Sequence, residues 1–196
     1  MTTALAPHFE RVEASDTHPD LILMWQALQK NLRMPSSVSE EMYESYREGE
    51  PGAIRGFVGF ACSFGGKWFG GYARSGQRNI ADEASRSLVR DIRKMLNVSF
   101  MCRDYREIQV TATDVIYCDP PYADTTEYRE TFNSREFWEV AKQWSLIGAS
   151  VYVSEYRCPY GWETLWENER TQLLRVGISE SVTEKLFIPQ TRFYVP

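Results

Sequence analysis

The sequence has few of the features that mark a secreted, membrane or metal-binding protein. No apolar run approaches the length of a bilayer span, and the N-terminus lacks the basic and then apolar order of a signal peptide. The four cysteines lie far apart and form no Cys-x-x-Cys pair, which argues against a zinc site. From these absences we expect no metal site, no membrane association, and reduced thiols in a cytoplasmic protein.

The chain also lacks an excess of positive charge. The chain has 22 Lys and Arg residues against 27 Asp and Glu residues, which gives a formal net charge of -5. Because phosphate contacts need local positive potential, any nucleic-acid site must be a basic patch on an acidic body. A length of 196 residues allows one sizeable domain, or a core with an inserted lobe.

The hydrophobic pattern predicts an α/β protein in which strands and helices alternate. We expect strands at 9–15, 98–102, 115–118 and 149–154, and two antiparallel strands within 171–195. Helices are expected from Pro19, from the capping-box pattern Ser37-Val38-Ser39-Glu40, over 79–96, and from about Ser134. The glycine-rich residues 49–78 are expected to form a functional loop.

The most informative residues are 115–122, where an apolar run ends in Asp119-Pro120-Pro121-Tyr122. The carboxyl end of a strand in an open α/β sheet is where ligands bind. The two prolines remove backbone donors, so the turn presents carbonyl groups and one carboxylate. Such an acceptor-only patch suits the exocyclic amino group of a planar base. The alternative is a Pro-Pro turn after a core strand, with no ligand.

This tetrapeptide resembles the catalytic motif of amino-group DNA methyltransferases, and its Asp form resembles the adenine-N6 class. The resemblance implies that Asp119 and the Pro120 carbonyl bind the amino group and that Tyr122 stacks on a base flipped out of double-stranded DNA. It implies S-adenosylmethionine as the cofactor. Phe187 and Phe193 are candidates for a second wall around the base, although a core role is expected for at least one of them.

Residues 63–74 resemble the aromatic, glycine and arginine segment of phage-type Dam-family adenine methyltransferases. Glycines let the backbone approach DNA, aromatic side chains can stack or wedge, and basic residues attract phosphates. The alternative is a tight turn that packs its aromatic side chains beneath the inserted helices. The expected DNA-binding residues are Lys67, Trp68, Phe69, Tyr72, Arg74 and Arg78.

The same resemblance implies cofactor contacts from Asp119 and from the ends of two other strands. Asp16 resembles the carboxylate that binds the ribose hydroxyls, and Asp104 with Tyr105 resembles the acidic-aromatic pair that contacts the adenine. Ser154-Glu155-Tyr156 resembles the segment on the far side of the pocket. The alternatives are a helix cap for Asp16 and a solvated loop charge for Asp104.

The chain departs from the family because it lacks both the Phe-x-Gly-x-Gly-like element and the Pro-Phe-x-Gly-Gly-like loop. The resemblance therefore predicts a Rossmann-like methyltransferase sheet without its first strand, which would lie between the second and fourth. Either the remaining strands close this gap, or an N-terminal polypeptide fills it. We expect a catalytic remnant at 1–24, an inserted, mainly helical target-recognition lobe at 25–97, and the catalytic domain at 98–196.

The expected function is site-specific DNA adenine-N6 methylation by base flipping, in the phage or restriction-modification setting of this family. The first alternative is a truncated, non-catalytic fragment that binds DNA or a partner chain. A second alternative keeps the chemistry but acts on cytosine N4 or on a protein amide. Asp before Pro-Pro favours adenine, and the glycine-aromatic segment favours DNA.

Overall fold

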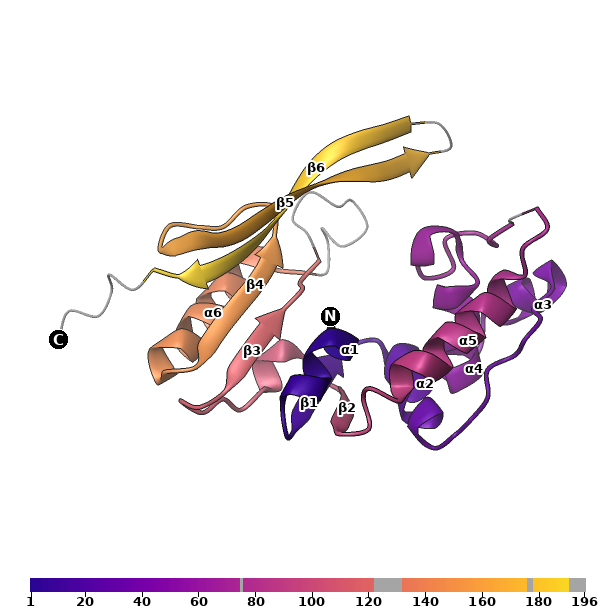
Figure 1. Ribbon diagram of the computed structural model, residues 1–196, viewed down its shortest axis with the longest axis horizontal. Coiled ribbons are helices and arrows are strands. Elements are labelled where there is room, and N and C mark those ends of the chain that lie inside the picture. Colours follow the sequence, from indigo (N-terminus) through magenta and orange to yellow (C-terminus); the bar gives the residue numbers. More distant parts are fainter. Residues whose placement is uncertain (75, 122–131, 176–177, 191–196) are drawn as a thin grey trace. The chain divides into compact units, whose positions relative to one another are not determined.

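The computed structural model describes residues 1–74, 76–121, 132–175 and 178–190, with the main chain alone for 170–175 and 178–180. The chain is a mixed α/β protein, as the sequence predicts, and it divides into two compact units (Figure 1). Unit 1 is Met1–Glu107 and unit 2 is Ile108–Pro196. The functional division at 24/25 and 97/98 stays a prediction, because compactness does not test it.

Unit 1 contains a two-stranded parallel sheet. β1 (Val12–Asp16) pairs with β2 (Val98–Cys102), with Asp16 opposite Cys102. β1 begins three residues later than the strand expected at 9–15, and the chain before it forms the short helix α1 (Thr2–Leu5) and a 3-10 turn at Ala6–His8. The Asn97 side chain ties this segment down, because its Nδ2 donates to the Ala6 carbonyl at 2.9 Å.

The chain between β1 and β2 forms a helical lobe. Its helices are α2 (Pro19–Gln29), α3 (Glu40–Ser45), α4 (Ala53–Gly56), a π-helix at Phe57–Ala61, a 3-10 turn at Phe64–Gly66, and α5 (Ile80–Ile92). α5 confirms the helix expected over 79–96, although it ends at Ile92. Ala81 and Ile92 are buried, and the Asn79 side chain caps the helix by accepting from the Asp82 N–H at 3.1 Å.

Two local expectations for the lobe are wrong. The cap of α3 is Ser39, whose Oγ accepts from the Met42 N–H at 3.1 Å, and not Ser37. Residues 53–61 are helical where the glycines suggested a loop. The reason is close packing, since a Cβ added to Gly59 would lie 2.8 Å from the Phe69 ring and overlap the Trp68 ring. Glycine at this position lets the π-helix pack directly against the rings of Trp68 and Phe69.

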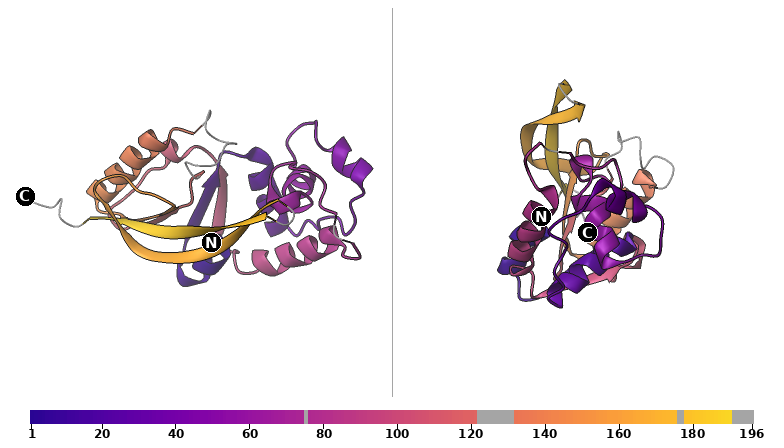
Figure 2. Two further views of the ribbon diagram at one scale, coloured as in Figure 1. Left: turned by 90° about the horizontal axis from the view of Figure 1, so that it is seen from above. Right: turned by 90° about the vertical axis from the view of Figure 1, so that its right-hand side faces the viewer.

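Unit 2 is a four-stranded sheet with strand order β3-β4-β6-β5. β3 (Val115–Cys118) and β4 (Ser150–Glu155) are parallel, whereas β5 (Trp162–Arg175) and β6 (Ile178–Pro189) form an antiparallel hairpin. The hairpin begins nine residues earlier than the sequence suggested. It extends well past the three positions at which β6 pairs with β4 (Figure 2).

α6 (Ser134–Ile147) packs on this sheet with Phe137, Ala141 and Trp144 buried as expected. Trp138 is also buried, and its ring lies 4.9 Å from the Trp162 ring. The helix ends at Gly148 with a φ of 111°, a left-handed conformation that favours glycine. No helix within the described part of the chain is long and apolar enough to cross a bilayer.

Candidate functional site

Asp119 lies at the carboxyl end of β3, as predicted, and its side chain is exposed. β4 runs parallel to β3, with Cys118 opposite Val153. Ser154 and Glu155 therefore emerge at the same sheet edge as Asp119. Pro120 and Pro121 follow Asp119 and are half-buried. Tyr122 and Phe193 lie outside the described residues, so their predicted roles are not addressed by the structure.

A hydrogen-bonded chain of side chains adjoins Asp119. Tyr117 shares a hydrogen bond with Ser154, whose Oγ donates to Glu184 Oε1 at 3.3 Å. Glu155 is 3% exposed, and its Oε1 accepts from the Tyr156 N–H at 2.8 Å. Sequence reasoning found Ser154-Glu155-Tyr156 but missed Tyr117 and Glu184. Tyr117 was detectable, because it lies two residues before Asp119 and so shares a strand face with it.

The pKa shifts at this edge arise from burial and from the negative charge of Asp119. Burial raises the pKa of the Tyr117 hydroxyl, the hydrogen bond with Ser154 opposes that shift, and Asp119 adds to it. Burial and Asp119 together raise the pKa of the Cys118 thiol to about 12. Both side chains are consequently neutral near pH 7, and Asp119 is the charged acceptor beside them.

Phe187, the other aromatic candidate for the base pocket, has a different position. It is 2% exposed, and its ring lies 6.2 Å from the Trp138 ring. Its packing is that of a core residue, which is the role expected from the sequence for at least one of Phe187 and Phe193.

In unit 1, the parallel pairing of β1 with β2 brings Asp16 and Asp104 to one sheet edge. Asp16 ends β1, and Asp104 follows the end of β2 by two residues. The Arg103 N–H donates to the Asp16 carbonyl at 3.1 Å, which fixes the two strand ends against each other. This arrangement is what the predicted cofactor contacts require within the unit.

The two carboxylates also make local contacts. Asp16 Oδ1 accepts from the His18 N–H at 2.7 Å, just before α2 begins. Asp104 accepts from the Arg106 N–H at 2.9 Å and from its guanidinium Nε at 2.8 Å. The Arg106 hydrogen bonds lower the pKa of Asp104. The Arg106 guanidinium also lies 5.6 Å from the ring centre of Tyr105, in the 3-10 turn Tyr105–Glu107. Sequence reasoning missed Arg106.

The aromatic residues of the 63–78 segment mostly face into the lobe. Phe69 is 7% exposed and packs against Tyr43 with ring centres 5.1 Å apart. Tyr72 donates its hydroxyl to the Val38 carbonyl at 2.7 Å. Trp68 is half-buried, with its ring 4.2 Å from His18 and 4.8 Å from Phe60. These contacts match the alternative in which the aromatic residues pack beneath the helices.

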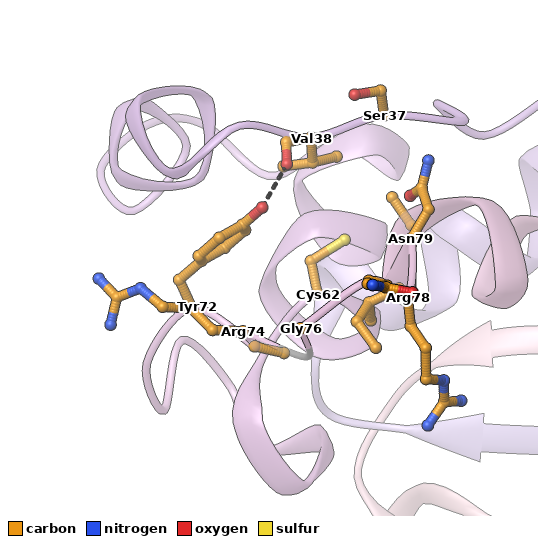
Figure 3. A pocket seen from close by; sticks show the side chains of 12 residues that line it. Ser37, Val38, Cys62, Tyr72, Arg74, Gly76, Arg78 and Asn79 are labelled. Carbon is orange, nitrogen blue, oxygen red and sulfur yellow. Dashed lines mark hydrogen bonds between the residues drawn. The ribbon is translucent and has the colours of Figure 1, made fainter.

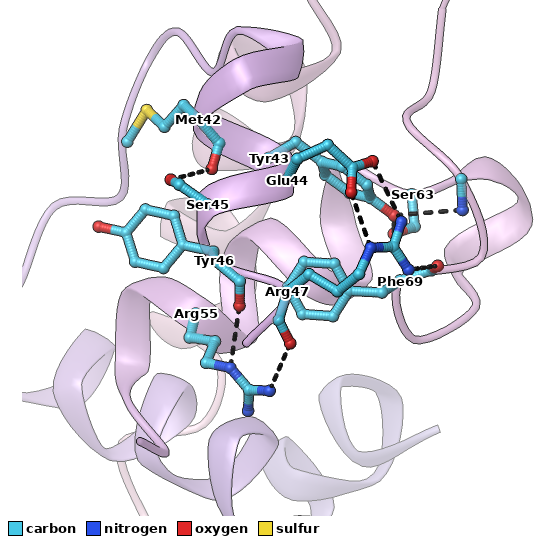
Figure 4. Close-up of polar contacts among 10 residues, drawn as sticks. Met42, Tyr43, Glu44, Ser45, Tyr46, Arg47, Arg55, Ser63 and Phe69 are labelled. Atoms are coloured by element: carbon cyan, nitrogen blue, oxygen red, sulfur yellow. Dashed lines mark hydrogen bonds and ion pairs between the residues drawn. The ribbon is translucent and has the colours of Figure 1, made fainter. Parts of the chain in front are cut away.

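Arg47 and Arg55 hold the aromatic residues of this segment in place (Figure 4). Arg55 lies over the Trp68 ring at 4.9 Å and donates to the Tyr46 and Arg47 carbonyls at 3.0 Å. Its Nη1 also donates to the buried Asp20 at 2.8 Å. Arg47 donates to the Phe69 carbonyl at 3.1 Å. No local pattern in the sequence indicates this network, which joins residues up to 35 positions apart.

The basic residues of the segment remain at the surface. Lys67, Arg74 and Arg78 are exposed. Arg74 and Arg78 line a cavity of about 480 Å³, and Figure 3 shows them on either side of Cys62 in that view. Burial raises the pKa of the Cys62 thiol, which also lines the cavity, to about 11, so this side chain is neutral near pH 7. No group of three or more potential metal ligands occurs among the described residues.

Comparison with known protein families finds a match for part of the chain. Residues 66–159 match the family described as D12 class N6 adenine-specific DNA methyltransferase. No curated protein matches the chain. The matched range contains the exposed basic residues, Asp104 and the Asp119 turn, and it ends just after β4. Asp16 and the β5–β6 hairpin lie outside it. The resemblance inferred from the sequence is confirmed over the matched residues.

Proposed function

Because residues 66–159 resemble the D12 class N6 adenine-specific DNA methyltransferases, we propose that this chain carries the adenine-binding and DNA-binding parts of a site-specific DNA adenine-N6 methyltransferase. The observation that carries the proposal is the exposed Asp119 carboxylate at the carboxyl end of β3, beside the Tyr117–Ser154–Glu184 side chains. A DNA substrate also fits the cytoplasmic location expected for a protein whose four cysteines are free.

The chemistry requires a hydrogen-bond acceptor at this place. The lone pair of the adenine amino group is delocalised into the ring, so the nitrogen is a weak nucleophile. Asp119, with the Pro120 carbonyl, accepts the amino hydrogens and lets the nitrogen become pyramidal as it attacks. A base inside a duplex is out of reach, so the adenine is flipped out before it meets Asp119. S-adenosylmethionine supplies the electrophilic methyl group.

The residues of unit 1 fit the adenosine part of this cofactor. Asp16 and Asp104 present carboxylates at one sheet edge, which suits ribose hydroxyls and an adenine amino group. Arg106 keeps Asp104 ionised, because it lowers the pKa of that carboxyl. The glycine elements that would cradle the methionine end are absent from the sequence. We therefore expect the 196-residue chain to bind S-adenosylmethionine weakly and to methylate DNA slowly or not at all.

The sheet edges support a complementing polypeptide that carries the glycine loop. Among the described residues, β3 pairs only with β4, and β1 pairs only with β2. Parallel strands are normally covered and paired on both sides, and an isolated two-stranded sheet is marginally stable. The same observation favours a second candidate function, in which the chain binds DNA or a partner chain without methylating.

DNA contact is assigned to the exposed cations Lys67, Arg74 and Arg78. Trp68 and Tyr72 are partly exposed and can contribute at their outer edges, whereas Phe69 supports the segment from within. Neutralising the three cations together should lower the log-log salt slope of DNA binding by about 0.9 for each phosphate that the chain no longer neutralises. An unchanged slope in a fluorescence anisotropy titration would remove this segment from the DNA interface.

The test of the chemistry uses two matched aspartates that flank β3. Asp119→Asn should lower methyl transfer to adenine by on the order of 10²- to 10³-fold, measured with radiolabelled S-adenosylmethionine and the glycine-loop polypeptide added. DNA affinity should stay within a few-fold. Asp114→Asn removes the same charge at the amino end of the strand, where Asp114 accepts from the Thr111 N–H at 2.7 Å, and should leave transfer unchanged. Equal rates in the two variants would remove Asp119 from the mechanism.

A further inference from the structure

Both arginines of the proposed DNA-binding segment are paired with carboxylates of the same lobe. Arg74 Nη2 pairs with Glu40, in the first turn of α3. Arg78 binds Glu83, in the first turn of α5, through Nη2 and through Nε at 3.1 Å. The two pairs come from separate helices. In each pair, a glutamate binds the guanidinium of an arginine that lines the cavity in Figure 3.

These ion pairs are open to water and therefore weak. The side chains of Arg74 and Glu40 are 71% and 49% exposed, and those of Arg78 and Glu83 are 65% and 38% exposed. Exposed pairs of this kind change an equilibrium by roughly 2- to 5-fold, and salt screens them. Neither pair is needed to hold the lobe together, since its core is made by the buried aromatic and aliphatic residues.

A carboxylate and a phosphate offer a guanidinium similar geometry, because each presents oxygens that match the two-pronged arginine donor. A duplex supplies a dense row of phosphates and releases condensed counterions when an arginine neutralises one of them. DNA can therefore displace a weak carboxylate partner wherever its backbone comes close enough. Arg74 and Arg78 then gain a stronger partner without any rearrangement of the main chain.

We propose that Glu40 and Glu83 act as stand-ins for two DNA phosphates and release Arg74 and Arg78 when DNA binds. This inference rests on the proposed function, because it takes the same segment as the DNA interface. Its consequence is weaker binding to any duplex, because every duplex that reaches Arg74 and Arg78 must first displace the two carboxylates.

The exchange has a second consequence, for salt dependence. A carboxylate released from its arginine attracts a cation from solution, which offsets part of the counterion release from DNA. The wild-type chain should therefore show a shallower log-log salt slope than a variant that lacks the two carboxylates. A purely structural role for the pairs would not change this slope.

The experiment compares two double variants of the full chain on a labelled duplex of arbitrary sequence, by fluorescence anisotropy over a range of salt. Glu40→Gln with Glu83→Gln removes both stand-ins. Glu41→Gln with Glu48→Gln is the matched control, since it removes the same charge from exposed glutamates that pair with no described arginine. Glutamine keeps the size of glutamate, so the fold should persist, and urea unfolding of each variant checks this.

The proposal predicts that the Glu40/Glu83 variant binds about 4- to 25-fold tighter than wild type and with a steeper salt slope, from the roughly 2- to 5-fold strength of each pair. The control should gain clearly less. In an Arg74→Gln and Arg78→Gln background, the gain from Glu40→Gln and Glu83→Gln should fall to the level of the control. Equal gains in the two double variants, or a gain that survives loss of the arginines, would overturn the proposal. A wild-type chain that binds no DNA even at low salt would instead refute the DNA interface itself.

Discussion

Arg55 provides the sharpest test of how the lobe is held together. Its partner Asp20 is 1% exposed, with Oδ2 accepting from Arg55 Nη1 at 2.8 Å and Oδ1 accepting from the Gly52 N–H at 2.8 Å. Arg55→Met removes the guanidinium but keeps an unbranched side chain that can still pack on Trp68. The substitution leaves a buried carboxylate without its cation.

The expected loss follows from these contacts. Breaking a buried ion pair by removing one partner costs about 3–5 kcal/mol, because the remaining charge stays desolvated. The hydrogen bonds from Arg55 to the Tyr46 and Arg47 carbonyls, both at 3.0 Å, are lost as well. Since a whole domain is stable by only about 5–15 kcal/mol, the variant should be marginally folded.

Urea unfolding followed by tryptophan fluorescence measures this loss. With a slope of about 1–3 kcal/mol per molar urea, the midpoint should fall by more than about 1 M. Arg86→Met is the control, because Arg86 pairs with Asp82 at 2.7 Å on an exposed helix face and should cost less than about 0.5 kcal/mol. Adding Asp20→Asn to Arg55→Met should recover part of the stability. Equal midpoint shifts in Arg55→Met and Arg86→Met would refute a stabilising role for the buried pair.

Three further predictions concern single positions. Gly59→Ala should destabilise the lobe by about 1–3 kcal/mol in the same urea assay, because its Cβ would overlap the Trp68 ring, whereas Gly65→Ala, with open space around it, carries only the strain of a φ of 65°. In native protein at pH 8, a thiol reagent should label the exposed Cys102 before Cys62 and Cys118, because burial raises the pKa values of these two thiols to about 11 and about 12. Equal labelling rates for the three cysteines would contradict this burial. Burial lowers the pKa of His18, so the unfolded chain binds the proton more readily and stability should fall as pH drops below about 6.5. His18→Gln should flatten this pH dependence of stability between pH 7 and 5. An identical pH profile in the variant would exclude His18 as the source of the dependence.

The elements with strong local signals were predictable from the sequence. α5 shows its apolar residues at helical spacing and begins at an asparagine cap, and β3 is an apolar run that ends at two prolines. The placement of Asp16 and Asp104 at one edge also followed, because parallel strands end at the same side of a sheet. The local sequence pattern is enough to predict an element when the spacing of its apolar residues follows from the structure of that element alone.

Other features depend on contacts between distant residues and left no local signal. Gly56 and Gly59 suggested a loop, but their lack of a side chain serves close helix packing against α2 and Trp68. The role of the aromatic residues near Phe69 in DNA binding stays a prediction, but the contacts of Phe69 with Tyr43 and Arg55 inside the lobe left no local signal. The hairpin start at Trp162 was missed because its first residues do not alternate cleanly, and a register shift between Thr164 and Trp166 breaks the period.

The pairing of β1 with β2 also constrains the order in which unit 1 can fold. Val12 and Val98 are joined by roughly 86 residues, and closing a flexible loop of that length costs about 4 kcal/mol in chain entropy. The pairing of two short strands offsets little of this entropy cost. We therefore expect the intervening helices to assemble first, because they shorten the flexible chain that the pairing must close. On this reasoning, the edge that carries Asp16 and Asp104 should be the last part of the unit to form and the first to open. A variant that loosens the lobe at Arg55 should therefore weaken the nucleoside binding that we propose for that edge, even though Arg55 lies in the helices between the two strands.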